Sequence, residues 1–262
     1  MQNSKQFGKL FYGLGMAGIG GLQFIFPWFR PVLLPVPPEA TQNLTVLVYL
    51  TGLALVAAGL FIAFGRQVKT TALLLGSALL LFLVFGHLPN RLTNHPAMLG
   101  AWTDALKLLA LSGGAFMVAG LFPENNFPRF LNIPARIVPY GKYFFGVMLL
   151  LFGIDHFLYI DFVKTLVPAS IPGPEFWTYL TGAALMGAGL AILINFKPWE
   201  VGLLLAGMLA IWLVVLHIPR ALAAPASDNR NEWTSVFQCL AFGGMALMWV
   251  GTARKGTFRA TI

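Results

Sequence analysis

Residues 49–60 read YLTGLALVAAGL, and residues 179–190 read YLTGAALMGAGL. Nine of the twelve positions are identical at an offset of 130. The same offset places the His-x-Pro sequence at 87–89 on the one at 217–219, and an offset of 131 places Trp102-Thr103 on Trp233-Thr234. These matches indicate an internal duplication, with a first unit at 1–122, a proline-rich linker at 123–141 and a second unit at 142–262.

Each copy of this stretch lies within a long run of apolar residues. Of the 262 residues, 58% are apolar and only 10% are Asp, Glu, Lys or Arg, against about 25% charged residues in an ordinary soluble domain. The mean hydropathy is +0.76. Such a chain lacks the charged surface of a soluble enzyme, a disordered protein or a nucleic-acid-binding domain. We therefore predict an all-α integral membrane protein that lies in the lipid bilayer and has no nucleic-acid partner.

The number of membrane spans follows from the length of the apolar runs. A helix that crosses the roughly 30 Å hydrocarbon core needs about 20 residues. Eight segments fit, at 10–29, 43–65, 70–90, 100–122, 140–160, 176–196, 201–219 and 233–253. We predict eight transmembrane helices in two four-helix bundles. Because each bundle has an even number of spans, the repeats are parallel and related by a pseudo-two-fold axis along the membrane normal.

The distribution of basic residues predicts the orientation. Eleven Lys and Arg residues lie on the side of the termini, against five on the opposite side. The eleven are Lys5, Lys9, Arg66, Lys69, Arg129, Arg136, Lys142, Lys197, Arg254, Lys255 and Arg259, and the five are Arg30, Arg91, Lys164, Arg220 and Arg230. By the positive-inside rule, both termini are expected in the cytoplasm, with the protein in a bacterial inner or plasma membrane.

Ionisable side chains are costly inside a membrane and therefore indicate a candidate site. In the predicted topology they lie toward the span ends that face away from the termini, which predicts an outward-facing polar pocket in each half and no continuous ion path. The candidate ligand-binding residues are Asp155, His156, His217, Arg220, Trp177, Tyr179, Trp233, His87, Arg91, Asp104 and Lys107.

The sequence around Pro219 suggests what such a pocket would bind. His217 and Arg220 share a helix face only if the helix continues past Pro219, and a proline at this point is expected to end or kink the helix. An imidazole beside a guanidinium suits an anion or a carbonyl-bearing head group. The alternative is that both residues only anchor the helix end at the membrane interface. We expect Asp155 to meet His217 or Arg220 from another helix.

The two halves differ at the expected pocket. At an offset near 132, Gln23 and Phe24 take the place of Asp155 and His156. The second half is therefore expected to carry the stronger site. In the first half, Asp104 and Lys107 lie three residues apart and are expected to pair, whereas the second half has Ser235 and Gln238 in their place.

Small residues and metal ligands complete the predictions from the residues. Gly13, Ala17 and Gly21 repeat every four positions, as do Ala183 and Gly187, which predicts close helix packing at these positions. A haem is not expected, because His87 and His217 lie in separate units. No metal site is expected, since zinc would need a third clustered ligand, and the single cysteine, Cys239, excludes an internal disulfide.

Several motifs of the second half resemble a known family. They are GIDHF at 153–157, IPGP at 171–174, YLTG at 179–182, LHIPR at 216–220 and EWT at 232–234. Together they resemble the DoxX family of small four-helix membrane proteins, and the likeness covers 143–253. The first half resembles a degenerate second copy, which keeps the Tyr-x-Thr-Gly, His-x-Pro and Trp-Thr sequences and lacks the Asp-His pair.

The resemblance implies a role as a quinone- or lipid-interacting component of a membrane redox or stress-response system. A quinone is the cofactor that it suggests. Two alternatives stay open. One is a non-catalytic membrane scaffold or chaperone that binds a protein partner, and the other is a small-solute transporter. The sequence assigns no catalytic residue and leaves open whether the protein is an enzyme.

Overall fold

The computed structural model describes residues 2–65, 67–123, 127–224 and 231–253, and this part of the chain is helical, without β-strands. The long helices are α1 (Gln2–Ile25), α3 (Thr45–Phe64), α4 (Val68–Phe82), α6 (Thr103–Ala119), α8 (Gly141–Leu158), α10 (Pro174–Leu193), α11 (Pro198–Trp212) and α13 (Asn231–Val250). The short helices are α2 (Pro38–Thr41), α5 (Leu88–Asn94), α7 (Asn132–Ala135), α9 (Ile160–Val163) and α12 (Ile218–Ala223). Single turns η1 (Gln42–Leu44), η2 (Leu83–His87), η3 (Leu99–Trp102), η4 (Arg129–Leu131), η5 (Val138–Tyr140), η6 (Lys164–Leu166) and η7 (Leu213–His217) join them.

The helices bear out an all-α membrane protein. Within the described residues, six helical stretches are long and apolar enough to cross a membrane. They are Thr45–Phe64, Val68–Asn94, Arg129–Leu158, Pro174–Leu193, Pro198–Ala223 and Asn231–Val250. Helices α1 and α6 are not among them. Helix α6 has 17 residues and carries Asp104 and Lys107, and α1 is rich in glycine.

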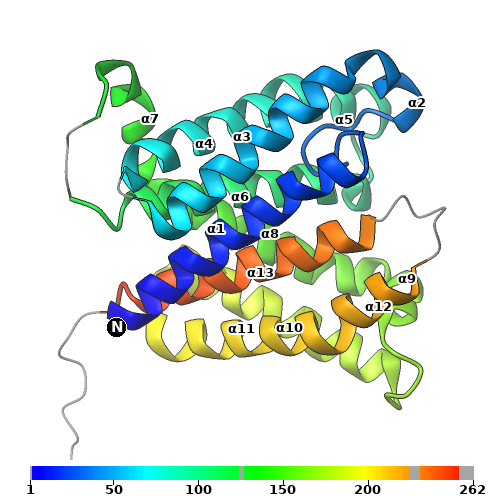
Figure 1. The fold of residues 1–262 in the computed structure, drawn as a ribbon. Helices are drawn as coiled ribbons and strands as arrows, with labels where there is room; N and C mark the ends of the chain where they lie inside the picture. The colour runs from blue at the N-terminus through cyan, green and yellow to red at the C-terminus, as the bar shows by residue number, and fades with distance from the viewer. Residues whose placement is uncertain (1, 66, 124–126, 225–230, 254–262) are drawn as a thin grey trace, which may run out of the picture.

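The long helices lie roughly along one common direction (Figure 1). Helices α1 and α13 run beside each other through the middle, with α3 and α4 on one side and α10 and α11 on the other. The N-terminus and α7 lie at one end of the bundle, and α2, α5, α9 and α12 lie at the opposite end, here called the distal end. Of the basic residues used to predict orientation, Arg66, Arg230, Arg254, Lys255 and Arg259 lie outside the described residues.

The same helix pairs recur in the two halves of the chain. Helix α1 packs on α3 as α8 packs on α10, and α4 packs on α6 as α11 packs on α13. Between the halves, α1 packs on α13, and α8 packs on α6. The first helix of each half therefore lies against the last helix of the other half, and all eight long helices share one core.

Glycines set the closest helix contacts. A methyl group on Gly59 of α3 would lie 2.4 Å from the carbonyl oxygen of Gly13 of α1, and one on Gly189 of α10 would lie 2.7 Å from that of Gly146 of α8. Between the halves, a methyl group on Gly244 would lie 2.5 Å from the carbonyl oxygen of Gly8. In the same way, a methyl group on Gly113 would lie 2.4 Å from the carbonyl oxygen of Gly141. Backbones this close leave no room for any side chain.

The predicted packing of the small residues is only partly correct. Gly13 and Ala17 face Gly59 of α3, as expected. A methyl group added to Gly21 or to Gly187 would have no neighbouring atom within 4 Å, and Ala183 is exposed. The prediction for these three residues was wrong. A four-residue spacing shows that small residues share one face of a helix, but it does not show whether that face is turned toward a neighbouring helix.

The packing glycines also correct the alignment of α1 with α8. Gly13 corresponds to Gly146, an offset of 133 instead of 132. In this register Gln23 and His156 make the same contact in the two halves. A methyl group added to Gly52 would lie 3.1 Å from Cβ of Gln23, and one added to Gly182 would lie 2.7 Å from Cβ of His156. Gln23 is therefore the counterpart of His156, and the counterpart of Asp155 is the buried Leu22. The identical glycines at this offset were a sequence signal for the correct register.

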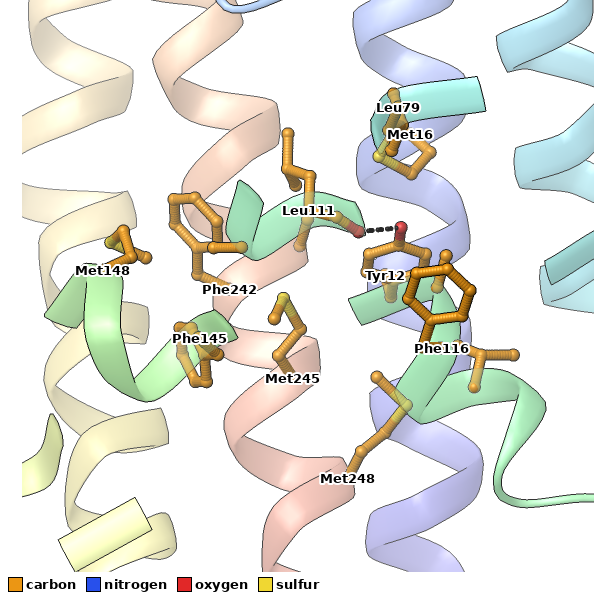
Figure 2. Packing of buried hydrophobic residues seen from close by; sticks show 14 of the residues in the cluster. Tyr12, Met16, Leu79, Leu111, Phe116, Phe145, Met148, Phe242, Met245 and Met248 are labelled. Carbon is orange, nitrogen blue, oxygen red and sulfur yellow. Dashed lines mark hydrogen bonds between the residues drawn. The ribbon is translucent and has the colours of Figure 1, made fainter. Parts of the chain in front are cut away.

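Apolar side chains from both halves fill the centre of the bundle (Figure 2). The ring of Phe145 stacks on that of Phe242, with centroids 6.0 Å apart. Tyr12 is fully buried, and its hydroxyl donates to the carbonyl oxygen of Leu111 at 2.6 Å. This bond joins α1 to α6 in the middle of the core and satisfies the one polar atom of the Tyr12 side chain.

Candidate functional site

Two π-helical turns lie at the distal end, one in each half. Turn η2 ends at His87 and turn η7 ends at His217, and in both the next N–H bonds to the carbonyl oxygen five residues back. Helices α5 and α12 then continue the chain through Pro89 and Pro219. Of the two expected effects of the proline, an end or a kink, the structure excludes the first, because the helix continues past the proline in both halves. The wider turn directly precedes the position where the proline N–H is missing. Such turns occur frequently at functional sites.

The first-half histidine is enclosed. His87 is fully buried, and its Nε2 lies 3.2 Å from the carbonyl oxygen of Val32. Its Nδ1 has no hydrogen bond within the described part of the chain. Asp104 and Arg91 lie close enough to interact with it electrostatically.

The second-half histidine has a different environment. No hydrogen bond reaches His217 from the described residues, and its Nδ1 is buried. Glu232, Lys107 and Arg220 lie within electrostatic range. Since Lys107 belongs to α6, a charge from the first half acts on the histidine of the second half.

Asp155 is buried without the partners predicted for it. Its side chain is 7% exposed, and neither carboxylate oxygen has a hydrogen bond within the described residues. The prediction that His217 or Arg220 would meet it was wrong. The guanidinium of Arg220 instead binds the carboxylate of Glu232, a residue in the first turn of α13. This carboxylate neutralises the charge of Arg220 locally.

His156, the neighbour of Asp155, points to another helix. Its Nδ1–H donates to the carbonyl oxygen of Phe152 at 2.7 Å, and its ring stacks on Trp212 of α11 with centroids 6.3 Å apart. Adjacent residues of a helix point about 100° apart, so Asp155 and His156 point in different directions. The stacked His156–Trp212 pair joins α8 to the end of α11, directly before turn η7.

The expected ion pair between Asp104 and Lys107 is present, with Nζ and Oδ1 3.3 Å apart. Both side chains are about a quarter exposed. The ammonium of Lys107 also lies 6.0 Å from the ring centroid of Phe152 on α8. The pair therefore connects the two halves at the distal end.

A hollow of about 290 Å³ opens beside this pair. Its lining is apolar and comprises Pro96, Ala97, Leu99, Trp102, Leu106 and Leu151. Asp155 follows Leu151 by four residues, which places it one helical turn along the same face. Tyr159, a further turn on, accepts a hydrogen bond from the N–H of Gly100 at 3.1 Å. Asp155 is not among the residues that line the hollow, but it lies one helical turn beyond Leu151, which is one of them.

The remaining candidates lie at the distal end but apart from Asp155. Trp177 is exposed and donates from its indole nitrogen to the carbonyl oxygen of Pro172 at 3.1 Å. Tyr179 is exposed and packs on Phe157, with ring centroids 5.4 Å apart. Trp233 and Arg91 are half-buried on α13 and α5.

Sequence reasoning missed Arg30. From the sequence it counts only among the basic residues on the side away from the termini. The structure buries it fully, with its guanidinium 4.9 Å from the ring centroid of Trp28 and 5.8 Å from that of Phe26. The signal was the placement of an arginine among aromatics in FPWFRP at 26–31, because a guanidinium packs well on aromatic faces.

The loop after α8 is held by an exposed ion-pair network. Lys164 binds Asp161 at 2.9 Å and Glu175 at 3.0 Å. The hydrogen bonds that the Lys164 ammonium donates, first to Asp161 and then to Glu175, raise the pKa of Lys164 above its usual value. Lys164 therefore stays charged at neutral pH and ties the loop to the start of α10.

Comparison with known proteins finds no relative of this chain. No protein-family model, curated protein or solved structure matches this chain. The chemistry of the distal end therefore carries the functional argument. It combines a buried carboxylate, an imidazole without a hydrogen bond within the described residues, a stacked His–Trp pair and an apolar hollow.

Proposed function

We propose that this protein is a DoxX-like integral membrane protein whose distal end binds a quinone or a lipid. In this proposal it has eight transmembrane helices in two parallel repeats, and both termini lie in the cytoplasm of a bacterial inner membrane. The distal end then faces outward. The recurring helix pairs and the matched glycine contacts of the two halves support the duplication.

The count of eight spans includes α1 and α6. At 1.5 Å per residue, the 24 residues of α1 extend over about 36 Å, and the 17 of α6 over about 26 Å before η3 is added. Both lie among other helices, and 12 of the 17 residues of α6 are buried. A helix shielded from lipid by its neighbours needs less hydropathy of its own to lie at membrane depth.

The buried carboxylate of Asp155 is the observation that carries the proposal of a ligand. A charged or polar group that is buried without hydrogen bonds destabilises a fold. A carboxylate one helical turn from a residue that lines an apolar hollow is therefore suited to a ligand that supplies the missing donor. The apolar lining and the stacked His–Trp pair favour a molecule that is mostly apolar, such as a quinol head group or a hydroxyl-bearing lipid.

A binding experiment tests the proposal. The purified protein is titrated with a ubiquinone analogue that carries a ten-carbon tail, in its oxidised and its quinol form, and tryptophan fluorescence reports binding near Trp102 and Trp212. We expect saturable quenching that Asp155→Asn weakens and that Asp161→Asn leaves unchanged, since the Asp161 side chain is 90% exposed.

The other outcomes separate the rival functions. Native mass spectrometry of the protein from its own membrane identifies what remains bound. A retained quinone or lipid supports the proposal. A co-purifying protein together with no quinone or lipid binding would overturn it in favour of the membrane scaffold.

A further inference from the structure

The histidine of the first π-helical turn already has a carbonyl partner from its own chain. Nε2 of His87 lies 3.2 Å from the carbonyl oxygen of Val32. A carbonyl oxygen can only accept, so Nε2 carries the proton and donates. The segment 29–34, here called the plug, covers this histidine, and Phe29, Val32 and Leu33 in it are at most 2% exposed.

A glycine makes room for the plug. Gly86 directly precedes His87, and a methyl group on it would lie 2.5 Å from Cδ2 of Leu34. At the offset of 130, the second half has Leu216 in this position. The first-half turn therefore has a glycine where the Leu34 side chain of the plug packs, and the second-half turn has a leucine in this position.

The second-half histidine has no such cover within the described residues. The loop after α8 contains α9 and η6, and neither has a buried residue. No hydrogen bond to His217 occurs in the described part of the chain, and of its two ring nitrogens only Nδ1 is fully buried. Ile211 and Val214 beside it are 62% and 63% exposed. Nε2 of His217 is therefore not fully buried, and in the tautomer in which it carries the ring proton it can donate to a ligand.

We propose that Nε2 of His217 donates a hydrogen bond to a carbonyl oxygen of an apolar ligand, in the manner in which Nε2 of His87 donates to Val32. The chain then holds two copies of one site, of which the first is filled by the plug and the second is open. This inference rests on the proposed function and deepens it, because it names the binding atom and the chemistry of the ligand.

The surroundings of His217 suit this ligand. The cations near His217 are each paired with a carboxylate, Lys107 with Asp104 and Arg220 with Glu232. These surroundings are close to neutral overall and suit an uncharged carbonyl group rather than an anion. The stacked His156–Trp212 pair lies directly before the turn, and a planar ring could extend this stack. A quinone ring and the acyl ester of a lipid both supply the required carbonyl, and the experiment distinguishes these two sources.

Histidine-selective ¹⁵N labelling provides the readout, because the chain has only four histidines. The protein is placed in nanodiscs of diether lipid, which has no acyl carbonyl, and titrated with the ten-carbon ubiquinone analogue. We expect one quinone per chain and a change in the Nε2 signal of His217 alone. The same change on transfer to diester nanodiscs without quinone would assign the carbonyl to the lipid.

Matched variants test the two copies separately. His217→Ala is expected to weaken binding at least about tenfold, the loss of one useful hydrogen bond. His87→Ala is expected to leave the affinity within about twofold, because its site is filled by the plug. Leu33→Asp, which expels the plug from its apolar seat, is expected to raise the stoichiometry toward two, and adding His87→Ala should return it to one.

Each contrary result has a distinct meaning. Quinone or lipid binding that survives His217→Ala would overturn this inference and leave the proposed function standing. Equal losses for His87→Ala and His217→Ala would overturn it in favour of one shared site. The absence of quinone and lipid binding altogether would overturn both. If Leu33→Asp does not fold, the two histidine variants still decide.

Discussion

At the scale of single residues, the two halves of this chain place different side chains in the same positions. Asp155 and Leu22 occupy corresponding positions on α8 and α1, and both are buried. Leucine matches an apolar environment, whereas the carboxylate finds no hydrogen bond within the described residues. A residue that costs stability and is retained is typical of a functional site.

Asp155→Leu, which installs the first-half residue, tests this trade-off. We expect the free energy of unfolding of the ligand-free protein to rise by roughly 1–3 kcal/mol, because an unsatisfied buried polar group is removed. Thermal unfolding in detergent would show a higher melting temperature together with lost quinone binding. The reverse change, Leu22→Asp, should destabilise. A less stable Asp155→Leu variant would mean that the carboxylate has a structural partner.

Tyr12 provides a residue-scale prediction for the core. Tyr12→Phe keeps the ring and removes the bond to Leu111, leaving that carbonyl oxygen without this donor. We expect a loss of about 1–2 kcal/mol in the free energy of unfolding. Tyr140→Phe is the control, since Tyr140 is 58% exposed. Equal melting temperatures for the two variants would show that the Tyr12 bond contributes nothing net.

At the scale of helices, glycine contacts decide which faces pack. Helix α10 shows the contrast within one turn, because Gly189 faces the backbone of α8 and Gly187 faces open space. Both substitutions to alanine raise helix propensity by about 1 kcal/mol. Any difference between them therefore reports packing alone.

Gly189→Ala is expected to destabilise the protein by a few kcal/mol, since its methyl group would lie 2.7 Å from the carbonyl oxygen of Gly146 and force α8 and α10 apart. Gly187→Ala is expected to be neutral or slightly stabilising. Folded yield and melting temperature in detergent measure both. A destabilised Gly187→Ala variant would indicate that this face packs on a second molecule.

At the scale of the whole molecule, orientation in the membrane is the property that the function most depends on. Asp161 lies at the distal end and Arg129 at the end of the N-terminus, and both are exposed. The proposal places the first outside the cell membrane and the second inside. Their positions therefore report the topology directly.

Single-cysteine labelling measures this. In a Cys239→Ser background, which removes a buried thiol, Asp161→Cys should react with a membrane-impermeant maleimide in intact cells. Arg129→Cys should react only after permeabilisation. The opposite pattern would place the His217 site on the cytoplasmic side, and the outward-facing part of the proposal would be wrong.

The sequence by itself determined the all-α membrane class and the approximate bounds of the long helices. Long apolar runs with few charges have only one stable arrangement in lipid, where each helix satisfies its own backbone. The repeated YLTG and His-x-Pro sequences also identified His87 and His217 as corresponding residues, and the spacing of Asp104 and Lys107 was enough to predict their pairing.

Only the tertiary structure decided which side chains meet. The partner of Arg220 is Glu232 on the following helix, and the partner of His87 is a backbone carbonyl at Val32, which no side-chain pattern encodes. The register of α1 against α8 depends on which glycines touch across the interface. These contacts depend on helix rotation and approach, and a change of one residue rotates a side chain by about 100°, so helix bounds alone leave them undetermined.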